Sequence, residues 1–154
     1  MKKKCEIRKV NFFIFQTEFE FIERDLIVNF AQILKNQNCT HFHIVTGYAS
    51  NPDSSFFIPR IKGQCESKLE KLQFEKLFIY RPGLLRCQRS EFRPLEYIAR
   101  LFSYVFDFKN WWSIKVEDLA EVMINVAKTP LDYSSKSVII LEHQKIVSLM
   151  NNEH

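Results

Sequence analysis

Glycine is scarce in this chain of 154 residues, which contains only Gly47, Gly63 and Gly83. The common type of dinucleotide site needs a glycine-rich turn, GxGxxG, because backbone N–H groups must approach the pyrophosphate closely. Three glycines so far apart cannot form this motif. The chain therefore contains no complete dinucleotide-binding fingerprint.

Long hydrophobic runs are also lacking, since none approaches the ~20 residues that a membrane span needs. The N-terminal stretch MKKKCEIRKVNFFIFQ resembles a signal peptide only superficially. Its apolar part, residues 10–15, is short, is interrupted by Asn11 and is followed by no small-residue cleavage site. We therefore expect no membrane span and an intracellular protein, located in the cytoplasm or the nucleus.

Positive charge is concentrated at the N-terminus. The net charge is +4, and residues 1–10 account for all of it, with five basic residues against Glu6. The rest of the chain is neutral overall, so a basic stripe of the kind that binds nucleic acid is not expected. We interpret residues 1–9 as a basic, solvated tail, with a weak import signal or a phosphate contact as the alternative for its lysines.

Closely spaced metal ligands are missing as well. The four cysteines, Cys5, Cys39, Cys65 and Cys87, form no CxxC pair, and we expect them to be reduced and structural. His41 and His43 would share one face of a strand, but no third ligand suggests itself. No metal site is expected.

The chain is rich in apolar residues, which make up 46% and include 15 Phe. This composition predicts one globular domain, which we place at residues 10–150, followed by a short tail at 151–154. Strand-like apolar segments and helical patterns alternate along the chain. The predicted strands are 10–15, 41–46, 76–80 and 137–141, and the predicted helices are 23–38, 59–72, 96–106, 116–128 and 143–150, with WWSI as a further short strand.

Fully apolar strands that alternate with helices predict an α/β fold, a parallel sheet with helices on both faces. Such sheets bind ligands at the carboxyl ends of their strands, here near Thr46 and near Arg81 to Gly83. The predicted helix at 59–72 has an apolar face formed by Ile61, Cys65, Leu69 and Leu72. Two further helices show apolar faces at helical spacing. The first comprises Leu26, Ile27, Phe30, Ala31 and Leu34, and the second comprises Val116, Leu119, Ala120, Met123 and Ala127.

Three segments together resemble a known family. They are HFHIVTGYASNPDSSFFIPRIKG (41–63), LFIYRPGLL (77–85) and VEDLAEVM (116–123). In this order and spacing they are similar to the atypical short-chain dehydrogenase/reductases, and most of all to the Tat-interacting oxidoreductase family. The resemblance covers more than four-fifths of the chain but only the C-terminal half of a family member. It implies the second half of a doubly wound, Rossmann-type NAD(P)-binding fold, and a link to apoptosis control and nuclear import receptors.

The resemblance also implies a site. Such enzymes use a hydroxyl residue after this strand, a tyrosine, and a lysine four residues beyond the tyrosine; Thr46 and Lys62 match the first and last. Residues i and i+4 share a helix face, so the ammonium lowers the pKa of the phenol, which then serves as general acid and base. By the same resemblance, Lys62 would bind the nicotinamide ribose, and Pro82-Gly83 would run beside the nicotinamide.

The sequence departs from this pattern at Ile58, which occupies the tyrosine's position and cannot transfer a proton. Pro59 predicts that the helix begins near Ile58, because its ring would clash with a carbonyl one turn earlier. Tyr48 could replace the missing phenol only if its loop brought it within hydrogen-bond reach. The simpler interpretation is that Lys62 is an ordinary solvated lysine and that Pro82-Gly83 is an ordinary turn.

Two functions follow as hypotheses. The first is a truncated, catalytically disabled relative of NAD(P)-dependent Tat-interacting oxidoreductases that acts through protein contacts and binds no cofactor tightly. The alternative is the C-terminal part of an NAD(P)H-dependent enzyme whose N-terminal half is missing from this chain. In either case, helices made for absent neighbours should expose apolar surface, so we expect a protein partner or self-association.

Overall fold

The computed structural model describes residues 15–86, 112–128 and 137–151. Their fold divides into two compact units. Unit one contains the described residues of 1–42 and 49–77, and unit two contains those of 43–48 and 78–154. The helix predicted at 96–106 and most of the strand predicted at 10–15 lie outside the described residues; Phe15, the last residue of that strand, is instead helical.

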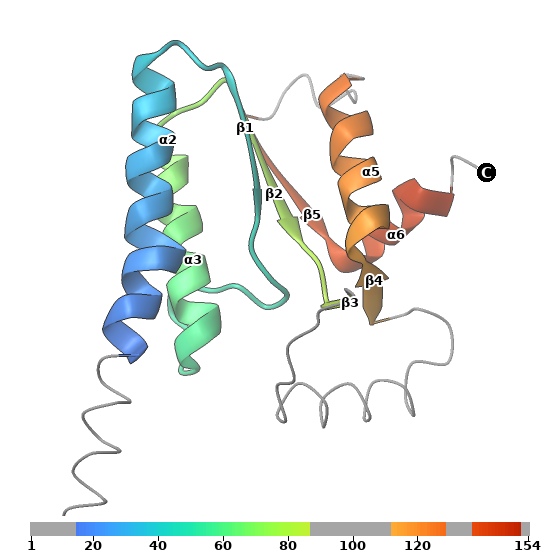
Figure 1. Cartoon of the computed structure of the whole chain (residues 1–154), viewed down its shortest axis with the longest axis horizontal. Coiled ribbons are helices and arrows are strands. Elements are labelled where there is room, and N and C mark those ends of the chain that lie inside the picture. The colour runs from blue at the N-terminus through green and yellow to red at the C-terminus, as the bar shows by residue number, and fades with distance from the viewer. Residues whose placement is uncertain (1–14, 87–111, 129–136, 152–154) are drawn as a thin grey trace, which may run out of the picture. The chain divides into compact units, whose positions relative to one another are not determined.

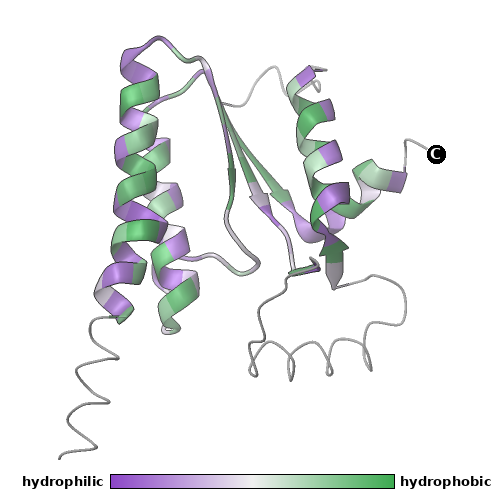
Figure 2. Ribbon diagram, in the orientation of Figure 1, coloured by the Kyte–Doolittle hydropathy of each residue, from purple (hydrophilic) through white to green (hydrophobic). Residues whose placement is uncertain are grey.

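A three-stranded sheet has the order β1-β2-β5 (Figure 1), with strands β1 (His41–Val45), β2 (Lys76–Arg81) and β5 (Val138–Glu142). At the start of β2, the Lys76 N–H donates to the Thr40 carbonyl at 3.2 Å, and beyond the end of β1 the Thr46 N–H donates to the Tyr80 carbonyl at 2.9 Å. The start of β1 thus lies beside the start of β2, and the end of β1 beside the end of β2, so the two strands are parallel. The predicted parallel α/β sheet is confirmed, and hydrophobic residues dominate its strands (Figure 2).

Unit one is built around two helical segments. Residues 15–20 are α-helical and continue into the π-helical turn η1 (Phe21–Leu26) and the helix α2 (Ile27–Asn36). The second segment, α3 (Phe57–Glu70), contacts both η1 and α2. Its N-cap is Phe56, so Pro59 falls in the first turn, where a missing N–H costs nothing. The predicted helix start near Ile58 is confirmed.

The inward faces of these helices agree with the sequence pattern only in part. Ile61, Cys65 and Leu69 of α3 are buried as predicted. In the other helical segment, however, Ala31 of α2 is the buried residue. Leu26 of η1 and Phe30 of α2, which the pattern assigned to the same apolar face, are exposed. The predicted stripe is wide, and only the edge that contains Ala31 is turned inward.

Unit two contains the main apolar core. A short parallel pair, β3 (Leu84–Arg86) and β4 (Ser113–Lys115), leads into α5 (Val116–Lys128), and β5 is followed by α6 (His143–Asn151). The buried face of α5 differs from the predicted one. It consists of Leu119, Val122 and Val126, which join Phe78, Tyr80, Ile114, Ile139, Leu141 and Ile146 in the core.

Candidate functional site

Thr46 lies at the carboxyl end of β1, as the sequence predicts. It is buried, and its hydroxyl is 3.5 Å from the Tyr80 carbonyl oxygen, the outer limit of a hydrogen bond. Two residues on, the Tyr48 N–H donates to the Pro82 carbonyl at 2.9 Å. The ends of β1 and β2 are thereby joined, and Thr46 and Pro82 belong to one unit, together with Gly83.

The Pro82-Gly83 turn is held by neighbours within unit two. The Gly83 N–H donates to Nδ1 of His143 at 3.2 Å, and the Leu84 N–H donates to the Trp112 carbonyl at 2.8 Å. A Cβ atom at Gly83 would lie 2.3 Å from that Trp112 oxygen. Glycine at this position is therefore required by local packing, whether or not a cofactor is bound.

An aromatic pair lies close to this turn. The Tyr48 ring meets the Trp112 ring edge-on, with centroids 4.4 Å apart, and both residues remain about half exposed. His143, in contrast, is buried. Tyr48 is thus engaged with Trp112 within unit two.

Lys62 is bound to a carboxylate within unit one. Its Nζ lies 2.8 Å from Oε2 of Glu23 in η1, and the two side chains are only 21% and 33% exposed. The ammonium is therefore partly shielded and already paired. Ile58, one helical turn earlier on α3, is 49% exposed and supplies no acid or base.

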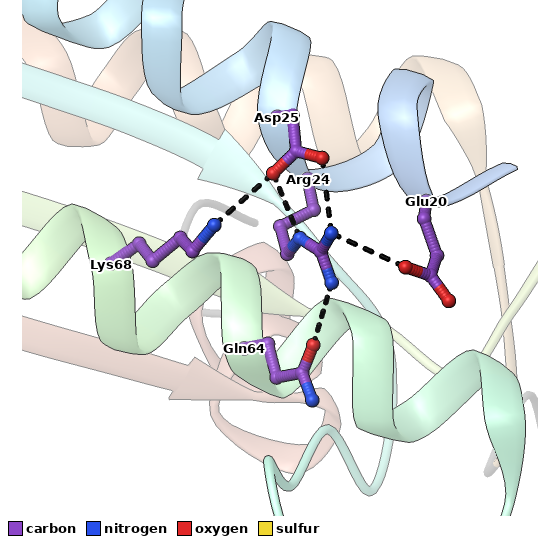
Figure 3. Close-up of polar contacts among 5 residues, drawn as sticks. All are labelled: Glu20, Arg24, Asp25, Gln64 and Lys68. Atoms are coloured by element: carbon purple, nitrogen blue, oxygen red, sulfur yellow. Dashed lines mark hydrogen bonds and ion pairs between the residues drawn. The ribbon is translucent and has the colours of Figure 1, made fainter. Parts of the chain in front are cut away.

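A second polar network lies beside this ion pair (Figure 3). The Arg24 guanidinium forms hydrogen bonds to Asp25 at 2.9 and 3.0 Å and to Gln64 of α3 at 2.8 Å, and an ion pair to Glu20 at 3.2 Å. Lys68 of α3 reaches the same Asp25 carboxylate at 3.1 Å. The hydrogen bond from Arg24 is the largest cause that lowers the pKa of Asp25 to about 2. Polar contacts thus join η1 to α3.

The candidate metal and thiol residues have ordinary environments. Nδ1 of His43 lies 3.1 Å from the Tyr80 hydroxyl, and its ring stacks on Phe78 with centroids 4.4 Å apart. Cys39 and Cys65 are free thiols. Burial raises the pKa of Cys65 to about 11, so this thiol is neutral at physiological pH and a poor nucleophile.

Comparisons with known proteins agree with the motifs. The chain is 32% identical to rat protein HTATIP2 over 133 residues, which is 85% of this chain and 54% of that protein. It is 30% identical to the mitochondrial protein fmp52 of Aspergillus fumigatus, over 77% of this chain and 52% of that protein. The chain belongs to the Tat-interacting oxidoreductase family. No protein-family model matches it.

Family membership extends over only part of the relatives' length. The chain spans about half of each of the two relatives above. Over that part, it is an oxidoreductase-like protein with an α/β fold. Within the described residues, no helix is both long enough and apolar enough to cross a membrane.

The sequence indicated the candidate site residues but not the residues to which they are bonded. It missed Glu23 at Lys62 and His143 at Gly83, which are 39 and 60 residues away in the chain. The run Glu23-Arg24-Asp25 marks a charged segment within the predicted helix at 23–38. Nothing in the spacing, however, indicates which helix that face contacts.

Proposed function

We propose that this protein is a catalytically disabled relative of the NAD(P)-dependent Tat-interacting oxidoreductases and acts through protein contacts. The proposal rests on two residues one turn apart on α3, Ile58 and Lys62. Ile58 replaces the phenol, and Lys62, the group that would activate it, is 2.8 Å from the Glu23 carboxylate. A carboxylate so close neutralises the positive charge that would lower a phenol's pKa.

The residues present do not fit a nicotinamide cofactor in the manner of the family. Lys62 is already paired with Glu23, and the Gly83 N–H is already bonded to His143. The glycine-rich turn that would hold the pyrophosphate is missing from the chain. We therefore propose that this chain does not transfer hydride, and we expect no tight binding of NAD(P)H.

A titration of the purified chain with NADPH, followed by nucleotide fluorescence and by calorimetry, tests this proposal. We expect no saturable binding at micromolar concentrations. Glu23→Gln is the matched variant, because it frees the Lys62 ammonium without changing the size of the side chain. Micromolar binding by the unaltered chain would overturn the proposal; binding by the variant alone would identify Glu23 as the group that blocks the site.

A second experiment restores the missing phenol. We predict that Ile58→Tyr will show no NADPH-dependent turnover of carbonyl substrates, because the phosphate-binding turn is missing and Glu23 still holds Lys62. Ile58→Phe controls for the effect of the ring without its hydroxyl. Turnover by the tyrosine variant but not by the phenylalanine variant would contradict the proposed loss of function.

The alternative is that the chain forms the C-terminal part of an NAD(P)H-dependent enzyme. It is favoured by the fact that the chain spans 54% of rat HTATIP2. Sequencing the full-length transcript upstream of the Met1 codon tests it. An in-frame segment with a glycine-rich turn would support the alternative, and a stop codon shortly upstream would contradict it.

We also propose a location in the cytoplasm or the nucleus. This rests on the resemblance to the Tat-interacting oxidoreductases, which implies a link to nuclear import receptors. The fungal relatives are named as mitochondrial, so the two locations must be compared directly. Imaging of the chain fused at its C-terminus to a fluorescent protein distinguishes them, and co-localisation with a mitochondrial marker would contradict the proposal.

A further inference from the structure

His143 is a buried histidine whose ring joins the start of α6 to the turn after β2. The residue is only 3% exposed. Its Nδ1 accepts the Gly83 N–H at 3.2 Å. A ring nitrogen that accepts a hydrogen bond carries no proton, so the proton of the neutral ring lies on Nε2. The hydrogen bond to Gly83 therefore requires a neutral ring.

The second ring nitrogen gives a charged ring no support. Nε2 of His143 is buried and has no hydrogen-bond partner. An imidazolium carries an N–H on both nitrogens. Its Nδ1–H would be directed at the Gly83 N–H, and two donors cannot bond to each other. The neutral ring thus keeps one hydrogen bond in the closed turn, whereas the charged ring would keep none and would leave buried donors unpaired.

No charged group in the described part of unit two is bonded to the His143 ring. Glu142, the preceding residue, pairs with Arg81 at 2.8 Å. His43 of β1 is bonded to the Tyr80 hydroxyl instead. The remaining charged residues of the neighbouring described elements form no ion pair or hydrogen bond with His143; they are Arg86 of β3, Lys115 of β4, Glu117 and Asp118 of α5, and Lys145 of α6. A positive charge on this ring would therefore have no bonded counter-charge among the described residues.

The position of the ring in the fold also opposes a positive charge. His143 is the first residue of α6, and the N-terminus of a helix carries a partial positive charge that disfavours a cation. An aromatic ring stabilises a cation that lies within ~6 Å of its face. The Trp112 ring is tilted by 54° to the His143 ring, and the two centroids are 6.4 Å apart. The closed turn is therefore suited to the neutral form of His143.

We propose that His143 is a pH-sensitive switch that holds the Pro82-Gly83 turn closed when it is neutral and releases the turn when it is protonated. Histidine is the side chain that ordinarily changes charge between about pH 5 and 8. A proton can bind to Nδ1 only after the Gly83 N–H has moved away, so acid favours the open turn. Because the Pro82 carbonyl accepts the Tyr48 N–H, opening also changes the surroundings of the half-exposed Tyr48–Trp112 pair.

The switch does not depend on the proposed loss of catalysis. It involves neither Ile58 nor Lys62, which lie in unit one. Its test uses the chain without nucleotide. NADPH binding could therefore succeed or fail without affecting the result.

Hydrogen exchange of the full, isotope-labelled chain, measured by NMR, tests the proposal. The quantity measured is the protection factor of the Gly83 amide, which corrects for the intrinsic dependence of exchange on pH. If a proton binds only the open turn, as tightly as it binds a solvated imidazole, the open fraction rises about tenfold from about pH 7.5 to about pH 5.5. We expect the protection factor to fall about tenfold over this range, in parallel with the titration of the His143 ring nitrogens.

His143→Asn distinguishes the switch from general sensitivity to acid. The asparagine oxygen can accept the Gly83 N–H but takes up no proton in this range, so the protection factor should stay constant. His41→Asn, at an exposed position of β1, should behave like the unaltered chain. Circular dichroism checks that both variants fold.

Two results would overturn the proposal. The first is a His143 ring that titrates in the unaltered chain while the protection of Gly83 stays the same. The second is a loss of protection in His143→Asn as large as in the unaltered chain. If His143→Asn does not fold, the comparison of the ring titration with the Gly83 amide in the unaltered chain still decides.

Discussion

The carbonyl oxygen of Trp112 occupies the space beside Gly83 that a methyl group would need, 2.3 Å from an ideal Cβ position. Real Cβ contacts are never so short, and the opposing atom is backbone, so it cannot rotate away. A side chain here would force apart the turn after β2 and the start of β4. The same carbonyl accepts the Leu84 N–H, so any shift would also weaken that hydrogen bond.

We therefore predict that Gly83→Ala will reduce the free energy of unfolding by about 2–3 kcal/mol, the usual cost of overpacking at a rigid site. Urea unfolding monitored by circular dichroism measures the change, and the m-value should stay constant. Asn29→Ala, at an exposed helical position, should change stability by less than ~0.5 kcal/mol. A Gly83→Ala variant as stable as this control would show that the chain relaxes around the methyl group.

Lys62 shows why a residue match to an enzyme motif does not establish a role. The resemblance implies a ribose contact at this position, whereas the structure pairs the lysine with Glu23. A half-buried ammonium needs a counter-charge in any folded protein, and Glu23 supplies it. Lys62 therefore contributes to the contact between η1 and α3 independently of a cofactor.

At the level of elements, η1 and α3 are joined by ion pairs whose strength depends on pH. The pKa of Asp25 is lowered to about 2, chiefly by its hydrogen bond from Arg24. In the unfolded chain the same carboxyl should titrate near ~3.9. Because the folded pKa is the lower one, the stabilisation is complete above about pH 4 and is lost as the pH falls toward about 2.

We predict that Asp25→Asn will destabilise the fold at pH 7 by at most about 1 kcal/mol, because the carboxylate is 36% exposed and solvent screens it. The difference from the unaltered chain should shrink between pH 4 and pH 2. Urea unfolding at several pH values measures it. Glu70→Gln, at an exposed position of α3, is the control and should show little difference at any pH. A loss for Asp25→Asn that did not depend on pH would mean that the carboxylate acts through packing rather than charge.

Most helices and strands could be predicted from the sequence, but the side that each helix buries could be predicted less well. The helix predicted at 116–128 is α5, because its pattern is regular and Glu117 and Asp118 favour a helix start there. Its buried side was predicted only in part. Leu119 is buried and Met123 packs against the core as predicted, but Val116 and Ala120 are exposed, and Val122 and Val126 are buried instead. Apolar residues occur on adjoining sides of this helix, and only the neighbouring elements determine which side is covered.

The same limit applies to the site. Thr46 and Pro82 could be placed at strand ends because parallel strands end at one edge of a sheet. The pairing of Lys62 with Glu23 could not be predicted, since it depends on how two helices pack. Likewise, the pattern could not show that Leu26 and Phe30 face outward.

For the molecule as a whole, the expected self-association implies that stability depends on protein concentration, because the described part of the chain exposes apolar side chains such as Leu26, Phe30 and Ile33. A partner that binds only the folded state adds to its stability by mass action, and in a homodimer that partner is the protein itself. A monomeric fold, in contrast, melts at one temperature whatever its concentration. Thermal unfolding at several protein concentrations therefore tests whether the chain associates with itself.

We predict that the melting temperature will rise by several degrees between 1 and 200 µM, because a weak contact between two copies should have a dissociation constant on the order of 10 µM, within this range. Differential scanning calorimetry measures it directly. Leu26→Glu places a charge among the exposed apolar side chains of helix 15–36, so its melting temperature should not change over the same range. In the control Ile124→Glu, at an exposed position of α5, it should rise as in the unaltered chain. If the unaltered chain melted at the same temperature throughout, the folded state would gain nothing from association, and the exposed apolar residues of helix 15–36 would require a different partner.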